Sequence, residues 1–434
     1  MTQIDQHHPH DDPPPAPPPR GVEAEGTSPL RLAMVVLGIV LLGLWTSLSA
    51  VVVVLAIVVM IFLHELGHFI TAKAAGMKCT EFFIGFGPRI WSFHRGETEY
   101  GIKAIPAGAY VKVIGMTNLE EVDPADEDRT YRQKSYWRRM SVAVAGSAMH
   151  FALALLCLFV LLVGFGMSDD DHWHVGRLAA ADGTDASPAA EAGVEVGDEI
   201  VSIGVTPIAT FDDVRDALEG REPGESVPVT VERGGVETQL SVALGDNGSG
   251  GAFLGIGPRH PRQTVAPLSA VPRAFTEFGS VSWQSMQALA DFFSPSGLGG
   301  FVSMAVDSAD EPTADESTVS SGSSADENRV LSIYGAARLG TQAADEGVAP
   351  LVAFLALINI FIGIFNLVPL LPLDGGHVAV ATYERIRELA ARTQGRYHAD
   401  VAKLMPLTYV VVFVLVGVGL IALYLDIADP VNLN

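Results

Sequence analysis

Cysteine is almost absent from this chain of 434 residues. The two that occur, Cys79 and Cys157, lie one in a polar stretch and one inside an apolar run. Two thiols are too few for a disulfide framework, and too few for a zinc site built on several cysteine ligands. The chain must therefore obtain its stability, and any metal site, from other side chains.

Positive charge is also scarce. Lys and Arg number 27 against 50 Asp and Glu, which gives a formal net charge of -23. So acidic a chain lacks the basic surface that binds a phosphate backbone, and no nucleic-acid partner is expected. Hydrophobic residues, in contrast, make up 49% of the chain, and the mean hydropathy is +0.31. Together with the long polar regions, this predicts an integral membrane protein with an appended soluble domain.

A cluster of ionisable residues ends the apolar stretch 57–72. His64, Glu65 and His68 form the pattern HExxH, and on a helix the two histidines share one face, with Glu65 beside them as a candidate base. The pattern also arises by chance, and the plain alternative is two histidines and a glutamate near a helix end. Three ionisable groups in an apolar run are costly unless they have a function, which favours a zinc site. A third ligand must come from elsewhere.

Charge asymmetry orients the predicted membrane spans. The 69 residues 71–139, after the first span, hold eleven Lys and Arg, and the 28 residues 378–405, after the third, hold five. The 181 residues 168–348 hold only nine Arg, no Lys and many acidic residues. By the positive-inside rule, the two basic segments are cytoplasmic and the long region is outside. The HExxH end of the first span and Asp374, at the end of the third, then lie at one membrane face. Asp374 can therefore supply the third ligand.

Several smaller patterns predict local structure. Aromatic and β-branched residues over 76–116 predict two or three short strands, with a hairpin turn near Arg95-Gly96. This sheet could offer a free edge to an extended peptide, or could simply cap the helix; the sequence leaves both open. His150, inside the second span, is expected to face the protein interior as a hydrogen-bonding residue rather than as a ligand. The helix predicted at 211–218 would begin at Thr210 or Asp212 as its N-cap.

Composition divides the chain into consecutive segments. We predict a polytopic α-helical membrane protein with four core transmembrane helices, a membrane-associated β-hairpin region and an inserted α+β domain. Residues 31–47 form an extra apolar segment that either spans the membrane or lies at its interface. The predicted segments are a disordered Pro/His-rich tail (1–30), the extra apolar segment (31–47), the first span (48–72), a cytoplasmic-side loop with the hairpin (73–139), the second span (140–167), the inserted domain (168–260), a linker (261–347) with an ordered loop at 292–301 and a disordered acidic insertion (307–328), the third span (348–374), a basic loop (375–406), the fourth span (407–425) and a tail (426–434).

These motifs, taken in register, resemble those of the site-2 protease family of intramembrane zinc metalloproteases, and of its bacterial regulator-of-sigma-E subgroup with one PDZ domain. The PDZ resemblance rests on residues 187–203, which begin Ser187-Pro188 and contain Gly197-Asp198. The family resemblance rests on His64 to His68, Phe86-Gly87-Pro88, Gly108 to Lys112, Asn366 to Pro369, and Leu373 to His377. His150 departs from the pattern, since related proteins often have Asn there.

The resemblance implies an activity and a site. It implies Zn²⁺ held by His64, His68 and Asp374, with Glu65 as the catalytic residue and Asn366 and Pro369 in substrate binding. It further implies cleavage, in or near the membrane, of single-span proteins such as anti-sigma factors, after an upstream site-1-type protease has shortened them. The expected location is the cell membrane, multi-pass, with the PDZ domain extracytoplasmic and the active site near the cytoplasmic face.

Two other functions compete with proteolysis. One is a metal-bearing membrane scaffold that binds partners through its PDZ domain without cleaving them; the intact Glu65 argues against it. The other is a transporter, because polar residues inside spans also mark ion pathways. Few spans and the HExxH spacing make the transporter the weakest of the three.

Overall fold

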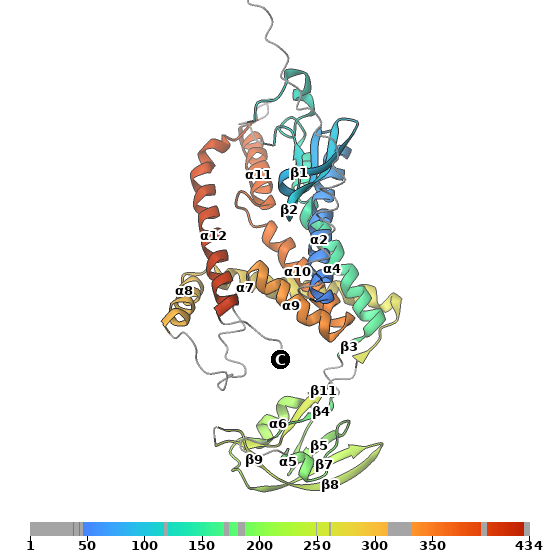
Figure 1. The fold of residues 1–434 in the computed structure, drawn as a ribbon. Helices are drawn as coiled ribbons and strands as arrows, with labels where there is room; N and C mark the ends of the chain where they lie inside the picture. Colours follow the sequence, from blue (N-terminus) through green and yellow to red (C-terminus); the bar gives the residue numbers. More distant parts are fainter. Residues whose placement is uncertain are drawn as a thin grey trace, which may run out of the picture. The chain divides into compact units, whose positions relative to one another are not determined.

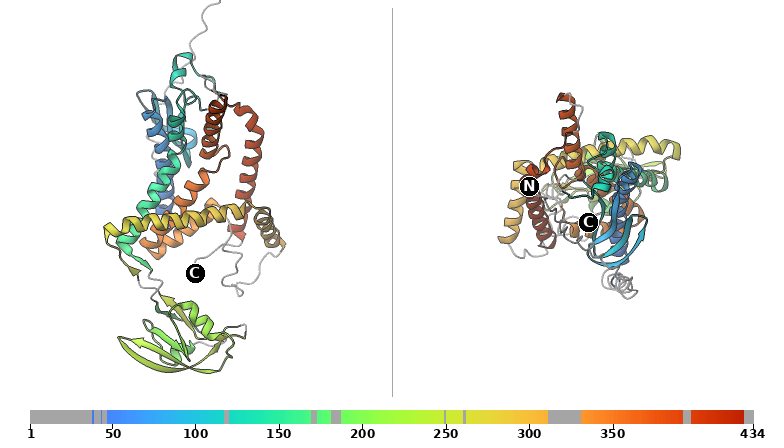
Figure 2. Two further views of the ribbon diagram at one scale, coloured as in Figure 1. Left: turned by 180° about the vertical axis from the view of Figure 1, so that it is seen from behind. Right: turned by 90° about the horizontal axis from the view of Figure 1, so that it is seen from above.

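In the computed structural model, whose fold is drawn in Figures 1 and 2, the chain divides into two compact units. The first comprises residues up to Gly146 together with Gly375–Val410, and the second comprises Ser147–Asp374 together with the chain from Val411 onward. The residues described are Gly38, Gly43, 47–116, 120–168, 173–180, 187–248, 250–259, 262–310, 331–391 and 397–428. The predicted N-terminal tail 1–30, nearly all of the extra apolar segment 31–47, and most of the acidic insertion lie outside these residues.

The first unit is built on the long helix α2 (Leu48–Ala74), which begins at the N-cap Ser47. Apolar residues surround this helix on all sides, as expected of a membrane span. The other elements of this unit are β1 (Cys79–Arg95), β2 (Thr98–Val113), the 3-10 helix Pro124–Arg129, α3 (Tyr136–Ala143), α11 (Asp374–Ala391, from Gly375 onward) and the 3-10 helix Val401–Leu404. A small core, centred on Ala72, Met77 and Val142, joins the end of α2 to the hairpin and to α3.

The hairpin consists of two long strands that each bend back on themselves. Phe82 pairs with Val111 on one side and Tyr100 on the other, and Tyr100 also pairs with Phe93. The result is a sheet of antiparallel segments in the order 109–113, 79–84, 98–103, 89–95, packed beside α2 (Figure 1). Gly85 and Gly87 make the bend in β1, both with positive φ, a conformation that favours glycine. The predicted turn near Arg95-Gly96 is confirmed, but the strands are longer than predicted.

The second unit holds helices that pack around α10 (Val348–Asn366). Two helices, α9 (Ile333–Glu346) and α7 (Pro267–Phe292), contact α10. Helix α7, seen in full in Figure 2, also contacts the π-helical turn Leu161–Phe165 that ends α4 (Ala145–Val160). Phe301 of α8 (Pro295–Asp310) packs on Ala422 and Leu425 of α12 (Met405–Ala428). The carboxylate of Asp426 accepts a hydrogen bond of 2.7 Å from Ser332 N at the start of α9.

The inserted domain has its own hydrophobic core, formed by residues such as Val175, Ile203 and Val229. Its main sheet has the strand order β6-β5-β7-β8, and β11 pairs with β4 separately. Thr210 is the N-cap of α6 and forms a capping box with Asp213. The elements are β3 (Met167–Ser168), β4 (His174–Leu178), α5 (Pro188–Glu191), β5 (Glu199–Ile203), β6 (Thr206–Pro207), α6 (Phe211–Leu218), β7 (Ser226–Arg233), β8 (Val236–Ala243), β9 (Gly245–Asp246), β10 (Ala252–Phe253), β11 (Ile256–Arg259) and β12 (Arg262–Gln263).

Among the described residues, four helical stretches are long and apolar enough to cross a membrane: Leu48–Ala74, Ala145–Phe165, Val348–Asn366 and Val401–Ile427. The protein therefore has the features of a polytopic membrane protein. Three predicted segments need correction. The region 292–301, predicted as a loop, contains the start of α8, and the first residues of the predicted insertion, 307–310, continue that helix. The basic loop after the third span is mostly the helix α11.

Candidate active site

The two histidines of the HExxH pattern lie side by side on α2. Their Nε2 atoms are 3.2 Å apart, and the residues His64 and His68 are 9% and 8% exposed. Two imidazole nitrogens that bind one tetrahedral zinc at about 2.0–2.1 Å lie about 3.3 Å apart. The pair is therefore spaced as two ligands of a single ion would be.

A main-chain carbonyl orients His68. The Nδ1 atom of His68 lies 2.7 Å from the carbonyl oxygen of Val142, in the last turn of α3. A carbonyl can only accept a hydrogen bond, so Nδ1 carries the proton and Nε2 keeps its lone pair for a metal. The contact between α2 and α3 thus fixes both the ring orientation and the tautomer.

Gly146 lies directly against both imidazoles. A Cβ atom at this position would be 2.3 Å from Cε1 of His64 and 2.5 Å from Nε2 of His68. Any larger residue would displace one of the rings. This role of Gly146 could not be predicted from the sequence, because a small residue in a predicted span is also explained by ordinary helix packing.

Asp374 completes a group that could hold a metal ion. One ligand atom from each of His64, His68 and Asp374 can be chosen so that all lie within 4.8 Å of one another, and among the described residues no other such group was found. Asp374 is the first residue of α11 rather than the end of the third span, because α10 stops at Asn366 and a non-helical stretch follows. Two imidazoles and one carboxylate are the donor set of many catalytic zinc sites, so the residues fit this metal.

Glu65 lies beside the histidine pair and against the sheet. Its Oε2 atom accepts a hydrogen bond of 3.1 Å from the backbone N of Val111 in β2, and its Oε1 atom is 4.0 Å from Nε2 of His64. The segment 109–113 is an edge of the sheet, so the Val111 N–H points away from the neighbouring segment 79–84. The outer edge of the hairpin therefore meets the candidate base.

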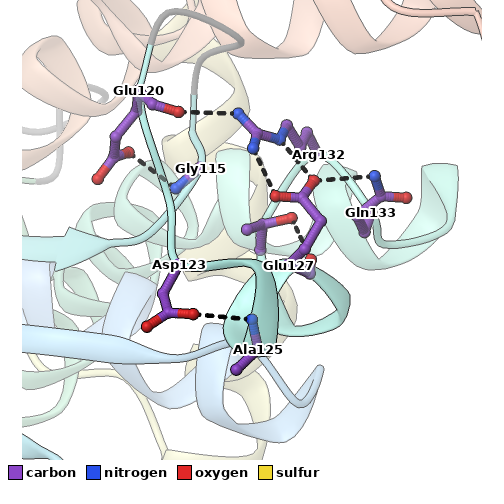
Figure 3. Close-up of polar contacts among 8 residues, drawn as sticks. Gly115, Glu120, Asp123, Ala125, Glu127, Arg132 and Gln133 are labelled. Atoms are coloured by element: carbon purple, nitrogen blue, oxygen red, sulfur yellow. Dashed lines mark hydrogen bonds and ion pairs between the residues drawn. The ribbon is translucent and has the colours of Figure 1, made fainter. Parts of the chain in front are cut away.

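Ion pairs hold the elements around this site. Arg139 of α3 pairs with Glu384 of α11, both almost fully buried, and Glu384 also accepts a hydrogen bond of 2.7 Å from Ala399 N. In the loop before α3, Arg132 binds Glu127 through two nitrogens and donates to the carbonyl of Glu120 (Figure 3). Hydrogen bonds from Arg132 and Gln133 lower the pKa of Glu127 to about 2. Glu127 therefore stays ionised at acidic pH values at which an ordinary glutamate would be protonated.

The remaining predicted residues lie outside the metal cluster. Asn366 ends α10 and Pro369 lies in the turn that leads to Asp374. Within the described residues, the half-buried side chain of Asn366 makes no hydrogen bond. His150 is buried and its Nδ1 lies 2.8 Å from Oδ1 of Asn359 in α10, which confirms that it is a hydrogen-bonding residue.

Proteins similar to this chain include zinc metalloproteases. Residues 52–410 match peptidase family M50. The chain is 33% identical over 416 residues to zinc metalloprotease Rip1 of Mycobacterium tuberculosis, covering 87% of this chain and 97% of that protein. It is 32% identical to Rip1 of Mycolicibacterium smegmatis (89% and 99% covered) and 30% identical to a putative zinc metalloprotease of Rhizobium meliloti (76% and 84% covered). A PDZ domain from an SdrC-like protein of Listeria monocytogenes aligns over 20% of this chain and 87% of its own, at 22% identity and a TM-score of 0.17, too low to support a conclusion about fold.

Proposed function

Because this chain belongs to peptidase family M50 and is a zinc metalloprotease, we propose that it cleaves single-span membrane proteins in or near their transmembrane segments. The observation that carries this proposal is the group His64, His68 and Asp374, with Glu65 beside it, on a helix that is long and apolar enough to cross a membrane. A water-dependent reaction at membrane depth requires such a polar site, enclosed by the protein.

His64, His68 and Asp374 would hold the zinc ion. Bound zinc lowers the pKa of a coordinated water from about 15.7 to about 7 and polarises a nearby carbonyl. His68 is held ready for this role by its hydrogen bond to Val142. The buried pair Arg139–Glu384 would keep the start of α11, and so Asp374, in place.

Glu65 would act as the general base and then as the general acid. Its carboxylate takes a proton from the attacking water and delivers it to the nitrogen of the leaving amide. The hydrogen bond from Val111 holds one oxygen, and the other faces the histidine pair. This orientation supports proton transfer at the point where the peptide bond would lie.

The substrate would bind as an extended strand along the outer edge of the segment 109–113. A transmembrane helix hides its carbonyls in its own hydrogen bonds, so it must unwind before cleavage, and an added strand satisfies the exposed backbone. The side chain of Asn366, with Pro369 in the turn beyond it, would hold the same unwound segment. Exposed Phe86 and Ile105 at the bends of the hairpin support its insertion into the bilayer.

The inserted domain would act as a PDZ domain outside the membrane. The charge asymmetry of the sequence supports a cytoplasmic position for the HExxH end of α2 and an extracytoplasmic position for residues 168–260. There the domain would exclude or read the outer part of a substrate until an upstream site-1-type protease has shortened it. Regulated proteolysis of an anti-sigma factor in the cell membrane would follow this order.

The proposal is tested by zinc content and cleavage in purified full-length variants. Glu65→Gln should retain about one zinc per chain and lose cleavage of a single-span substrate by about 10²–10⁴-fold, because only proton transfer is removed. His68→Ala should lose both zinc and cleavage. His94→Ala, at a histidine whose side chain is 62% exposed, should keep both.

Three results would count against this assignment. Full cleavage by Glu65→Gln would remove Glu65 from the mechanism. Stoichiometric zinc and normal activity in Asp374→Ala would mean that another residue supplies the third ligand. If the wild-type protein bound zinc but cleaved no membrane substrate, the protein would be a metal-bearing scaffold.

A further inference from the structure

A cavity lies at the turn of the hairpin and is formed by none of the zinc-site residues. Its volume is about 620 Å³, and its lining includes Lys73, Arg95, Glu97, Phe93 and Tyr100. Lys73 comes from the last turn of α2, and the other residues come from the two strand ends that meet at the turn. The cavity therefore lies where a candidate membrane span ends.

Positive charge exceeds negative charge around this cavity. Glu97 is shared by two cations, with Oε1 at 2.5 Å from Nζ of Lys73 and Oε2 at 2.7 Å from Nη2 of Arg129. Burial raises the pKa of Glu97, but the hydrogen bonds from Lys73 and Arg129 outweigh this effect and hold the pKa below its ordinary value. Even without Arg95, two cations therefore surround the single carboxylate of Glu97.

Arg95 adds a third cation that has no carboxylate of its own. Its side chain is exposed, and the part of the chain that the structure describes contains no acidic group in ion-pair contact with it. A guanidinium presents its donors in a planar fork that matches phosphate oxygens, and Lys73 supplies a point charge in the same cavity. The cavity is therefore complementary to an anion with several oxygens.

The aromatic residues indicate the surroundings of this anion. Phe93, 44% exposed, stacks on Tyr100 with ring centroids 5.3 Å apart, and Phe93 also contacts Trp91. Aromatic rings gather at the level of lipid headgroups, and lysines at the ends of spans extend their charge to that level. A cation-rich cavity next to exposed aromatic rings at the end of a span fits a phosphate that is joined to an apolar tail.

We propose that this cavity binds the phosphate of an anionic phospholipid headgroup. Arg95 and Lys73 bind the phosphate oxygens, Phe93 contacts the glycerol and the upper acyl chain, and Glu97 holds the turn in place. Since Glu97 joins the turn to the end of α2, the lipid would bind to the same small structure that anchors the hairpin. The proposal concerns a lipid site and stands whether or not the protein cleaves membrane substrates.

The test measures lipid selectivity in the full-length protein. The wild type is reconstituted into phosphatidylcholine bilayers, and electron spin resonance measures the immobilised fraction of spin-labelled phosphatidylglycerol against spin-labelled phosphatidylcholine. Arg95→Gln should lower the preference for phosphatidylglycerol about fivefold, because one cation near anionic headgroups is lost. Arg95→Lys should retain most of the preference. Arg215→Gln, at an arginine of the inserted domain whose side chain is 78% exposed and which lies outside every candidate span, should match the wild type.

Two outcomes would overturn the proposal. The first is an unchanged preference in Arg95→Gln, since no described residue forms an ion pair with this exposed side chain. The second is a wild-type protein without preference for phosphatidylglycerol that binds inorganic phosphate in an Arg95-dependent manner. That result would assign the cavity to free phosphate instead of to a lipid.

Discussion

Gly146 is the position at which a single methyl group should disturb the zinc site most directly. A Cβ atom there would lie within 2.5 Å of His64 and His68 ring atoms, and both rings are buried. Gly146→Ala should therefore weaken zinc binding about 10–100-fold, the range found when groups that orient metal ligands are altered. Competition with a chelator measures this affinity.

The control for this substitution lies in the same span. Gly164, in the π-helical turn after α4, has nothing within 4 Å of the site of an added Cβ. Gly164→Ala should leave zinc affinity unchanged. Equal affinities in the two variants would show that the rings can move aside without loss of the metal.

The residues that carry chemistry could be predicted from the sequence because their spacing reflects helix geometry. His64 and His68 are four positions apart, and the polar His150 stood out inside an apolar run. The groups that position them could not be predicted in this way. Gly146 and Val142 contribute a lack of volume and a backbone carbonyl, and neither property distinguishes them from other residues of a membrane helix.

At the scale of elements, the contact between α3 and α11 depends on one buried ion pair. Arg139 and Glu384 are 6% and 4% exposed. Glu384→Ala leaves a buried guanidinium without its partner and should cost about 3–5 kcal/mol of stability. The variant should also lose zinc more readily, because α11 begins at Asp374. Thermal unfolding in detergent, followed by zinc release, measures both effects.

A double variant separates the charge from the packing. Arg139→Met combined with Glu384→Leu removes both charges and keeps apolar volume, so most of the lost stability should return. If the double variant were no more stable than Glu384→Ala, the loss would come from packing or from the hydrogen bond to Ala399 rather than from the unpaired charge.

In the inserted domain, Asp198 links stability to pH. Arg233 donates two hydrogen bonds of 2.7 Å to its carboxylate and lowers its pKa, while burial acts in the opposite direction and the backbone N of Glu195 lowers the pKa further. A carboxyl group whose pKa is lower in the folded state stabilises the fold at pH values above its unfolded pKa of about 3.9. This stabilisation is lost as the pH falls through the folded pKa. Hydrogen-exchange protection of residues 187–248 should therefore fall below about pH 4.

Substitution identifies the carboxylate responsible. Asp198→Asn should reduce this protection about tenfold at pH 7, since charged hydrogen bonds are lost, and should flatten its decline at low pH. Asp212→Asn, at a carboxylate that is 81% exposed in the same domain, should behave as the wild type. An identical acid profile in all three proteins would remove Asp198 from the explanation.

The elements themselves were predicted unevenly. The four spans and the hairpin turn were predicted because long apolar runs and a glycine turn are strong local patterns. Helices α7, α8, α9 and α11 were not predicted, since they mix small, polar and apolar residues and owe their form to packing on their neighbours. The bends of the hairpin were also missed, because pairing on two sides is a property of the sheet and not of either strand.

At the scale of the whole molecule, the inserted domain joins the rest of the chain through paired strands. Ser168 of β3 pairs with Arg262 of β12, so the chain enters and leaves the domain at adjacent positions. A deletion that joins Ser168 directly to Arg262 should therefore leave the membrane helices intact. If the domain excludes unshortened substrates, the deletion variant should cleave a full-length single-span substrate that the wild type spares.

The shortened substrate provides the control for this deletion. The variant and the wild type should cleave it at similar rates, with similar zinc content. A variant that cleaved neither substrate while retaining zinc would indicate that the domain presents substrates instead of excluding them.

The hydrogen bond between His68 and Val142 has a consequence for how this site can change during evolution. Its acceptor is a carbonyl of the main chain, which every amino acid supplies, so no exchange of side chain removes it. Alanine scanning would therefore overlook the partner of this ligand, and descendants could vary at position 142 while keeping the interaction. The interaction depends on the path of the backbone in the last turn of α3. Insertions or deletions near this turn should therefore be far more damaging than substitutions.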